Sequence, residues 1–129
     1  MALTRPMLGD ELKIAPIDDV FDGALLNQRV GKLVTSNNIT FVYYLLQTSK
    51  LISDINRNIS GSEPPNLSTY QIEDIETLIP SKAEQQKIAD CLTSLDNRIT
   101  AQSQKIEALK LHKKGLMQGL FPAAAEPAA

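Results

Sequence analysis

The sequence predicts an α+β fold, in which a small mixed unit over residues 1–80 precedes one long helix over residues 81–122. Three observations predict this class. Short alternating apolar segments favour strands in the first part, and turn-forming Gly, Pro, Asn and Asp residues recur between them. No proline interrupts the chain between Pro80 and Pro122. The remaining residues, 123–129, are small, mostly Ala, and are expected to form a disordered tail.

The first unit is expected to contain two short strands. Residues 1–23 carry turn signals and are interpreted as irregular. One strand is predicted over residues 24–35, with an interruption at Gly31, and a second over residues 75–79, which Pro80 ends. A sheet this small is incomplete as the basis of an independent domain.

Two helices are expected between these strands. The polar residues 36–38 are typical of a helix start and precede a predicted helix over residues 39–56. After a loop over residues 57–67, Ser68 and Gln71 match a capping box, which opens a short helix. The apolar face of the first helix is predicted by steps of four and three residues between Phe41, Leu45, Thr48, Ile52 and Ile55.

The strongest periodic pattern lies in the last third of the chain. Ser81 and Glu84 match a second capping box. Beyond it, ten positions alternate in steps of four and three without a break, and eight of them are apolar, which predicts a coiled-coil seam. At ~1.5 Å per residue the helix is roughly 55–60 Å long, so it needs a partner helix. The seam positions are Ile88, Leu92, Leu95, Ile99, Gln102, Ile106, Leu109, Lys113, Leu116 and Leu120.

Four positions weaken this helix or its seam. Gln102 at a d position and Lys113 at an a position reduce stability, and polar residues there also select register and partner. Gly115 and Gly119 each disfavour the helix by roughly 1 kcal/mol relative to Ala. We therefore expect the final turns to fray or to pack against another chain.

The charge is distributed unevenly along the chain. The net charge is −2, but residues 1–80 contain six basic and ten acidic side chains, whereas residues 81–122 contain seven and four. A strong stand-alone nucleic-acid binder would be basic. The basic side chains have two interpretations, solubilising surface residues or contacts to DNA phosphate or an acidic partner. The candidates for phosphate contacts are Arg29, Lys32, Arg57, Lys105, Lys110, Lys113 and Lys114.

No enzymatic centre is predicted. His112 is the only histidine and lies among lysines, which favours a solvated helix residue over a catalytic base. Cys91, the only cysteine, falls at a g position beside the seam and is interpreted as a buried structural thiol. One His and one Cys make a metal site improbable, and a phosphate-binding glycine loop is absent. Neither catalytic residues nor a cofactor are therefore assigned.

The expected location is the cytoplasm. A single cysteine suits a reducing compartment, and no apolar stretch approaches the 18 residues that a membrane-spanning helix needs. Residues 1–10 lack the apolar region of a signal peptide. No membrane partner is expected.

Four sequence blocks in order resemble the specificity (S) subunits of type I restriction–modification systems. The most specific is Ile79 and Pro80, a short spacer, and then Glu84-Gln85-Gln86-Lys87-Ile88, which is similar to the signature that opens that family's conserved helix. Residues 21–30 resemble a late strand of the family's target-recognition domain, residues 59–68 the loop after it, and residues 103–122 the end of the helix.

This resemblance implies a non-catalytic DNA-specificity subunit. Residues 1–80 would be part of a target-recognition domain, and residues 81–122 one of the two helices that pair antiparallel as a spacer between half-sites. The implied partners are double-stranded DNA, the methylation and restriction subunits, and a second copy or another S polypeptide bound through the seam. Family recognition domains are about twice as long as residues 1–80, which implies a truncated domain with weak sequence preference.

Two other classes of function remain open from the residues. One is a coiled-coil interaction protein or regulator that has lost sequence-specific DNA binding. The other is an acidic DNA mimic, suggested by the excess of acidic side chains in residues 1–80. Binding to duplex DNA at low and moderate salt separates these classes from a specificity subunit.

Overall fold

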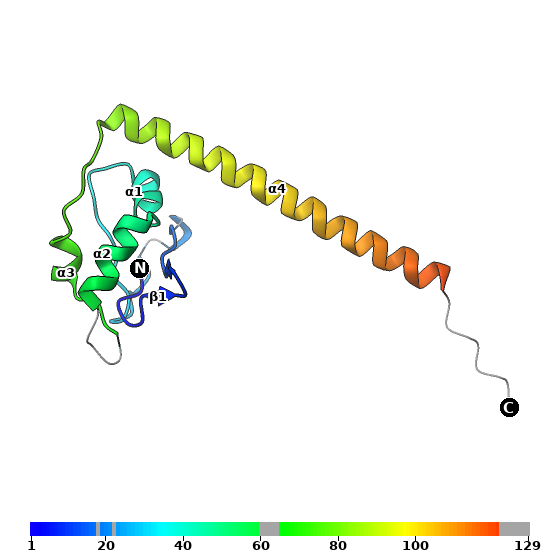
Figure 1. The fold of residues 1–129 in the computed structure, drawn as a ribbon, viewed down its shortest axis with the longest axis horizontal. Coiled ribbons are helices and arrows are strands. Elements are labelled where there is room, and N and C mark those ends of the chain that lie inside the picture. Colours follow the sequence, from blue (N-terminus) through cyan, green and yellow to red (C-terminus); the bar gives the residue numbers. More distant parts are fainter. Residues whose placement is uncertain (18, 22, 60–64, 122–129) are drawn as a thin grey trace. The chain divides into compact units, whose positions relative to one another are not determined.

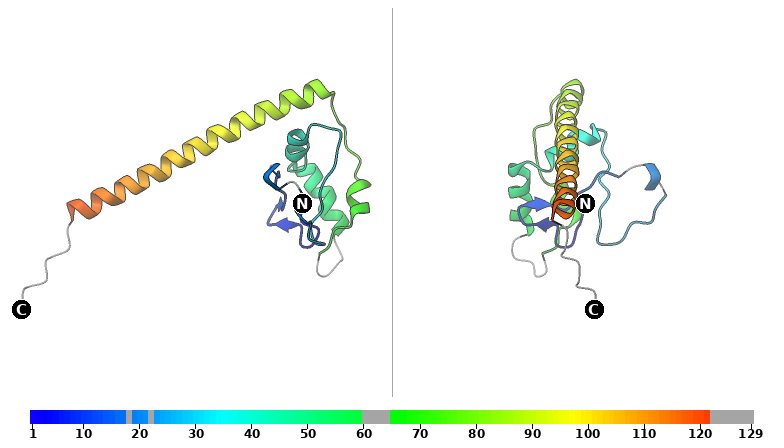
Figure 2. Two further views of the ribbon diagram at one scale, coloured as in Figure 1. Left: turned by 180° about the vertical axis from the view of Figure 1, so that it is seen from behind. Right: turned by 90° about the vertical axis from the view of Figure 1, so that its right-hand side faces the viewer.

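The structure, a computed structural model, describes residues 1–17, 19–21, 23–59 and 65–121. It confirms the α+β class, because a two-stranded sheet is accompanied by short helices and by one long C-terminal helix (Figures 1 and 2). The chain divides into two compact units, Met1–Asp90 (unit 1) and Cys91–Ala129 (unit 2). The predicted tail over residues 123–129 lies outside the described residues.

A short hairpin lies within the part of the sequence that was expected to be irregular. Strand β1 (Met7–Leu8) pairs antiparallel with β2 (Glu11–Leu12). Gly9 begins the two-residue turn with a φ of 61°, a conformation that glycine adopts without steric cost. The expectation of irregular structure over residues 1–23 was therefore wrong for this segment. The 3-10 helix η1 (Asp19–Phe21) follows it.

The first residues of the chain join two segments that are distant in sequence. Leu3 N donates a hydrogen bond to Arg29 O at 2.8 Å, and Leu67 N donates to Leu3 O at 2.8 Å. Isolated antiparallel bridges join Ala2 to Val30 and Thr4 to Asn66. Residues 2–4 thus lie between residues 29–31 and 65–67, and backbone pairing holds all three together.

The strands predicted over residues 24–35 and 75–79 are absent. Within these two ranges only Val30 takes part in a β-bridge. An alternating sequence forms a strand only where a neighbouring backbone accepts its hydrogen bonds. Among the described residues, the start of the chain provides such a neighbour only for residues 29–31, and no β-bridge includes residues 75–79. Leu25 is fully exposed as a result.

The predicted helix over residues 39–56 is two helices, α1 (Ile39–Leu45) and α2 (Ser49–Ile59). The break follows from local hydrogen bonds, because Thr48 Oγ1 donates to Leu45 O at 2.8 Å and so binds a carbonyl at the end of α1. The expected start is confirmed, since Phe41 N donates to the Asn38 side chain at 2.9 Å.

The predicted capping box at Ser68 is confirmed and opens α3 (Thr69–Glu73). Ser68 N donates to Gln71 Oε1 at 2.8 Å, and Gln71 N donates to Ser68 Oγ at 3.3 Å. The amide of Gln71 also donates to Asn58 O at 2.7 Å. Gln71 therefore both caps α3 and attaches it to the end of α2.

Two small aliphatic clusters form the core of unit 1. The first gathers Leu12, Ile55, Ile59 and Leu67, and Ile55 is completely buried. The second gathers Phe41, Val42 and Ala89. Ala89 belongs to the long helix α4 (Lys82–Leu120), so the first turns of α4 pack on α1.

Candidate functional site

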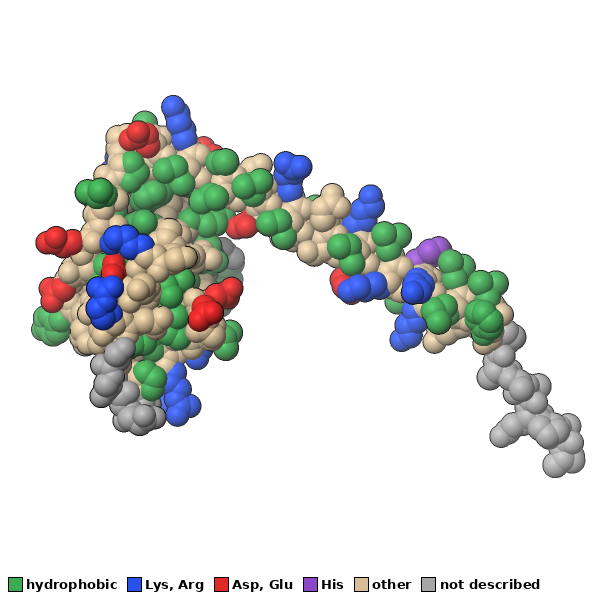
Figure 3. All heavy atoms as spheres, viewed as in Figure 1, with side chains coloured by type: hydrophobic (Ala, Val, Ile, Leu, Met, Phe, Trp, Pro, Cys, Tyr) green, Lys and Arg blue, Asp and Glu red, His purple; other side chains and the backbone are tan. Residues whose placement is uncertain are grey.

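The seam positions lie on the continuous helix α4, whose observed bounds agree with the predicted helix to within two residues. Their apolar side chains are mostly open to solvent, with Ile99 63% and Leu120 71% exposed. A shallow groove along one face of α4 is lined by seam residues Leu95, Ile99, Gln102 and Ile106. Figure 3 shows apolar side chains recurring along the helix between charged ones. Such an uncovered stripe is suited to a partner helix.

Two of the seven candidate DNA-binding cations are engaged with carboxylates. Arg57 Nη2 lies 3.3 Å from Asp54 Oδ1, and the same carboxylate receives Lys50 Nζ at 3.1 Å. Lys110 Nζ lies 2.7 Å from Glu107 Oε1. These pairs are exposed and contribute little to stability, but they reduce the positive charge that Arg57 and Lys110 present to a phosphate.

The other five candidate cations are exposed and make no ion pair within the described part of the chain. Arg29 and Lys32 lie in unit 1, on the segment without regular structure, and the rest lie on α4 in unit 2. These five are Arg29, Lys32, Lys105, Lys113 and Lys114.

The interpretation of Cys91 as a buried thiol was wrong, because its side chain is exposed. A g position is covered only where a partner helix lies against it, and the single helix leaves it open. His112 is also exposed. Among the described residues, no group of three or more His, Cys, Asp or Glu side chains is arranged to hold a metal ion. In the same residues, no helix is both long and apolar enough to cross a membrane.

The start of α4 is built by a capping box and a buried amide. Ser81 N donates to Glu84 Oε2 at 3.0 Å, as the sequence predicts. Hydrogen bonds from the Ser81 side chain and backbone lower the pKa of the Glu84 carboxyl. Because the ionised form is favoured in the folded chain, this contribution to helix stability is present above the unfolded pKa and is lost as the pH falls through the lowered pKa.

Gln85 is the one buried polar side chain of the described core, with 1% of its surface exposed. Its Nε2 donates to Asn37 Oδ1 at 3.0 Å and to Pro80 O at 2.9 Å, and its Oε1 accepts from Asn38 N at 2.9 Å. Both amide protons and the carbonyl are therefore satisfied, as burial requires. The Gln85 side chain thereby connects α4 to the loop before α1 and to Pro80, which precedes the capping box of α4.

The residues on either side of Gln85 extend this contact. Asn38 Nδ2 donates to Gln86 Oε1 at 2.8 Å, and the Lys82 ammonium donates to Ser36 O. Sequence reasoning identified residues 36–38 and 84–86 separately, the first as a cap and the second as a family signature. It missed that they bind each other, since nothing in either pattern indicates a contact across 47 residues.

Comparison with known proteins finds a match that includes the Gln85 contact. The family described as "Type I restriction modification DNA specificity domain" matches residues 13–111, which include unit 1 after the hairpin, the Gln85 contact and most of α4. The chain is also 29% identical over 124 residues to the type I restriction enzyme MjaVIII specificity subunit of Methanocaldococcus jannaschii. That alignment covers 94% of this chain and 29% of the relative. No solved structure matches the chain.

The chain is thus built as a mixed unit continued by a seam-bearing helix, and it belongs to the family of type I restriction modification DNA specificity domains. The resemblance noted from residues 79–89 is confirmed. The chain spans less than a third of the length of the curated relative that it matches.

We predict that Gln85→Met destabilises unit 1 by about 1–3 kcal/mol, because Asn37, Asn38 and Pro80 lose their buried partner atoms. The matched variant Gln86→Met removes an exposed amide of the same size and is expected to cost less than about 1 kcal/mol. Urea unfolding followed by circular dichroism measures both. Equal losses in the two variants would show that the Gln85 contact is not a main support of the unit.

Proposed function

We propose that this chain acts as a non-catalytic DNA-specificity component of a type I restriction–modification system. Unit 1 and the exposed lysines of α4 contact DNA, and the seam of α4 associates with another polypeptide. The observation that carries the proposal is the family match, which runs through both units and includes the signature at the Gln85 contact. The matching Methanocaldococcus jannaschii protein is itself named a specificity subunit. Methylation and restriction subunits are the corresponding larger partners.

The partner proposed for α4 is a second copy of the chain or another specificity polypeptide. Each helix offers eight Leu or Ile side chains on its seam. Full burial of such a side chain contributes roughly 1.5–3 kcal/mol, and the sum exceeds the roughly 4–15 kcal/mol that association costs. The family resemblance favours antiparallel pairing.

Antiparallel overlap over the whole seam has a specific consequence for Lys113. Ile88 then faces Leu120 of the second copy, and Leu95 faces Lys113. A parallel pair in register instead brings each seam residue opposite its own copy. The charge at Lys113 therefore provides a test of orientation, because a carboxylate at position 95 meets a lysine only in the antiparallel arrangement.

We expect the wild-type chain to be a dimer at tens of micromolar and Leu95→Lys to be monomeric, because a charge in the seam loses an apolar contact and leaves an ammonium without a partner. Ile106→Lys is expected to do the same. Ser94→Lys, outside the seam, is the control and is expected to remain dimeric. Light scattering gives the masses, and a monomeric wild type would disprove association of this chain with itself.

Leu95→Glu is expected to associate at least about tenfold more tightly than Leu95→Lys, because only the glutamate faces an opposite charge at Lys113. Sedimentation equilibrium of the two variants measures this difference. Equal weakening in both variants would exclude the antiparallel register described above.

The proposed contact with double-stranded DNA is electrostatic. Unit 1 contains more acidic than basic side chains overall, and of the five unpaired cations, Lys113 lies within the seam. Four exposed cations therefore remain for phosphates. We propose weak binding with little sequence preference, since base recognition that discriminates strongly needs many aligned polar contacts in the grooves.

The affinity for duplex DNA is expected to fall by up to about 100-fold between roughly 50 and 200 mM salt, as four phosphate contacts release their counterions. Lys32→Ala is expected to weaken binding at low salt more than Arg57→Ala, because Arg57 already lies against Asp54. Fluorescence anisotropy with a labelled random-sequence duplex measures both effects. Salt-independent binding, or a larger loss from Arg57→Ala, would contradict the assignment.

The alternative function is a coiled-coil regulator without DNA binding. The excess of acidic side chains in residues 1–80 favours it. It predicts a dimer that shows no shift of duplex DNA even at low salt. Dimer formation and DNA binding are measured separately, so the two candidate functions give different results.

A further inference from the structure

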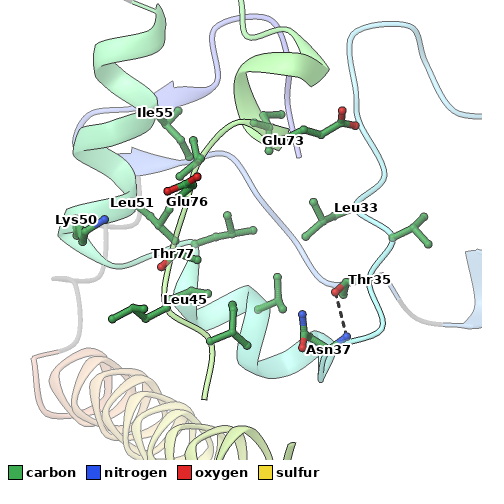
Figure 4. A pocket seen from close by; sticks show the side chains of 17 residues that line it. Leu33, Thr35, Asn37, Leu45, Lys50, Leu51, Ile55, Glu73, Glu76 and Thr77 are labelled. Atoms are coloured by element: carbon green, nitrogen blue, oxygen red, sulfur yellow. Dashed lines mark hydrogen bonds between the residues drawn. The ribbon is translucent and has the colours of Figure 1, made fainter. Parts of the chain in front are cut away.

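Unit 1 contains an open apolar groove of about 860 Å³. Helices α1 and α2 supply its floor, where Val42, Leu51 and Ile55 are buried. Two segments without helix or strand supply its rims, residues 33–35 and residues 76–79. Figure 4 shows Leu33 and Thr35 on one segment and Glu76 and Thr77 on the other, with Leu51 and Ile55 projecting from α2. Its volume lies in the range of sites that bind ligands, about 300–1,000 Å³.

The rims combine exposed apolar side chains with unpaired backbone. Val34 is 84% exposed and Leu78 is 95% exposed. In the described part of the chain, the backbone N–H and C=O groups of residues 33–35 and 76–79 make no hydrogen bonds. These are the same segments whose alternating sequences predict strands. Both therefore have strand-like sequences and lack a strand to pair with.

The chemistry of the groove selects among possible occupants. Its floor is aliphatic, so it offers little to a phosphate or a sugar. A helical occupant would cover the floor but leave the rim backbone unpaired, because the backbone groups of a helix bind within the helix. An extended peptide presents N–H and C=O groups at both edges and alternates its side chains between the two faces. Only this occupant satisfies the floor and the rims together.

We propose that the groove binds an extended, alternating apolar peptide segment of another polypeptide, which pairs as a strand with residues 33–35 or 76–79. The source that we assign is a specificity polypeptide other than a second copy of this chain, and this part of the inference rests on the proposed function. The binding chemistry itself depends on neither DNA nor α4.

Selection from a displayed library of random octapeptides on the immobilised full chain tests the proposal. We expect enrichment of sequences whose apolar residues alternate with polar ones. Val34→Lys and Leu78→Lys are expected to weaken the selected peptides at least about tenfold, because each places a charge on an apolar rim. Leu25→Lys is the matched control, since Leu25 is fully exposed and does not line the groove. Unchanged urea midpoints establish that all three variants fold.

Backbone pairing is tested by N-methylation of alternate residues in a selected peptide, which removes donors and leaves the side chains in place. We expect at least a tenfold loss of peptide affinity when the methyl groups lie on the pairing edge.

Four results would overturn the proposal. These are enrichment of helically spaced apolar residues, the absence of any enrichment, an equal loss of affinity in Leu25→Lys, and insensitivity to N-methylation. A dimer that persists in Leu95→Lys and dissociates in Val34→Lys would identify a second copy as the occupant and would also overturn it. Loss of DNA binding or of the α4 dimer leaves these results unaffected, so the two proposals fail separately.

Discussion

The arrangement of unit 1 depends on the buried carboxamide of Gln85. Its three hydrogen bonds connect the first turn of α4 to the loop before α1 and to Pro80. The aliphatic clusters of this unit are small, and a core of that size rarely gives more than a few kcal/mol. A satisfied polar contact between distant segments therefore contributes specificity as well as stability, since a different packing would leave buried amides without partners.

Helix α4 has two parts that differ in how they are stabilised, and they meet at Asp90. Up to Asp90 the helix is supported by Ala89 packing on Phe41 and Val42. Beyond it, no residue of α4 belongs to the two aliphatic clusters of the described residues, and isolated helices are marginal in water. Gly115 and Gly119 weaken it further. The stretch Cys91–Leu120 is thus the part of α4 that a partner helix on the proposed seam would stabilise.

The helix caps and the long periodic helix were predictable from neighbouring residues, and features that need a distant partner were not. Two local features were also missed, the β1–β2 hairpin and the break between α1 and α2. The capping boxes at Ser68 and Ser81 involve residues three positions apart, and α4 follows from a periodic seam. The predictions of strands over residues 24–35 and 75–79 were wrong, because a strand requires a second backbone to pair with and the sequence pattern does not identify one. The Gln85 contact was missed for the same reason, although the motif containing it was the one that indicated the family.

Amide hydrogen exchange of the full chain at about 1 and 100 μM tests the division of α4 most directly. Residues 82–90 are expected to be protected equally at both concentrations, because their support lies within the chain. Residues 92–120 are expected to exchange rapidly at the lower concentration and to become protected at the higher one, as the seam is covered. Equal protection of residues 92–120 at both concentrations, with that of 82–90 rising instead, would contradict the account.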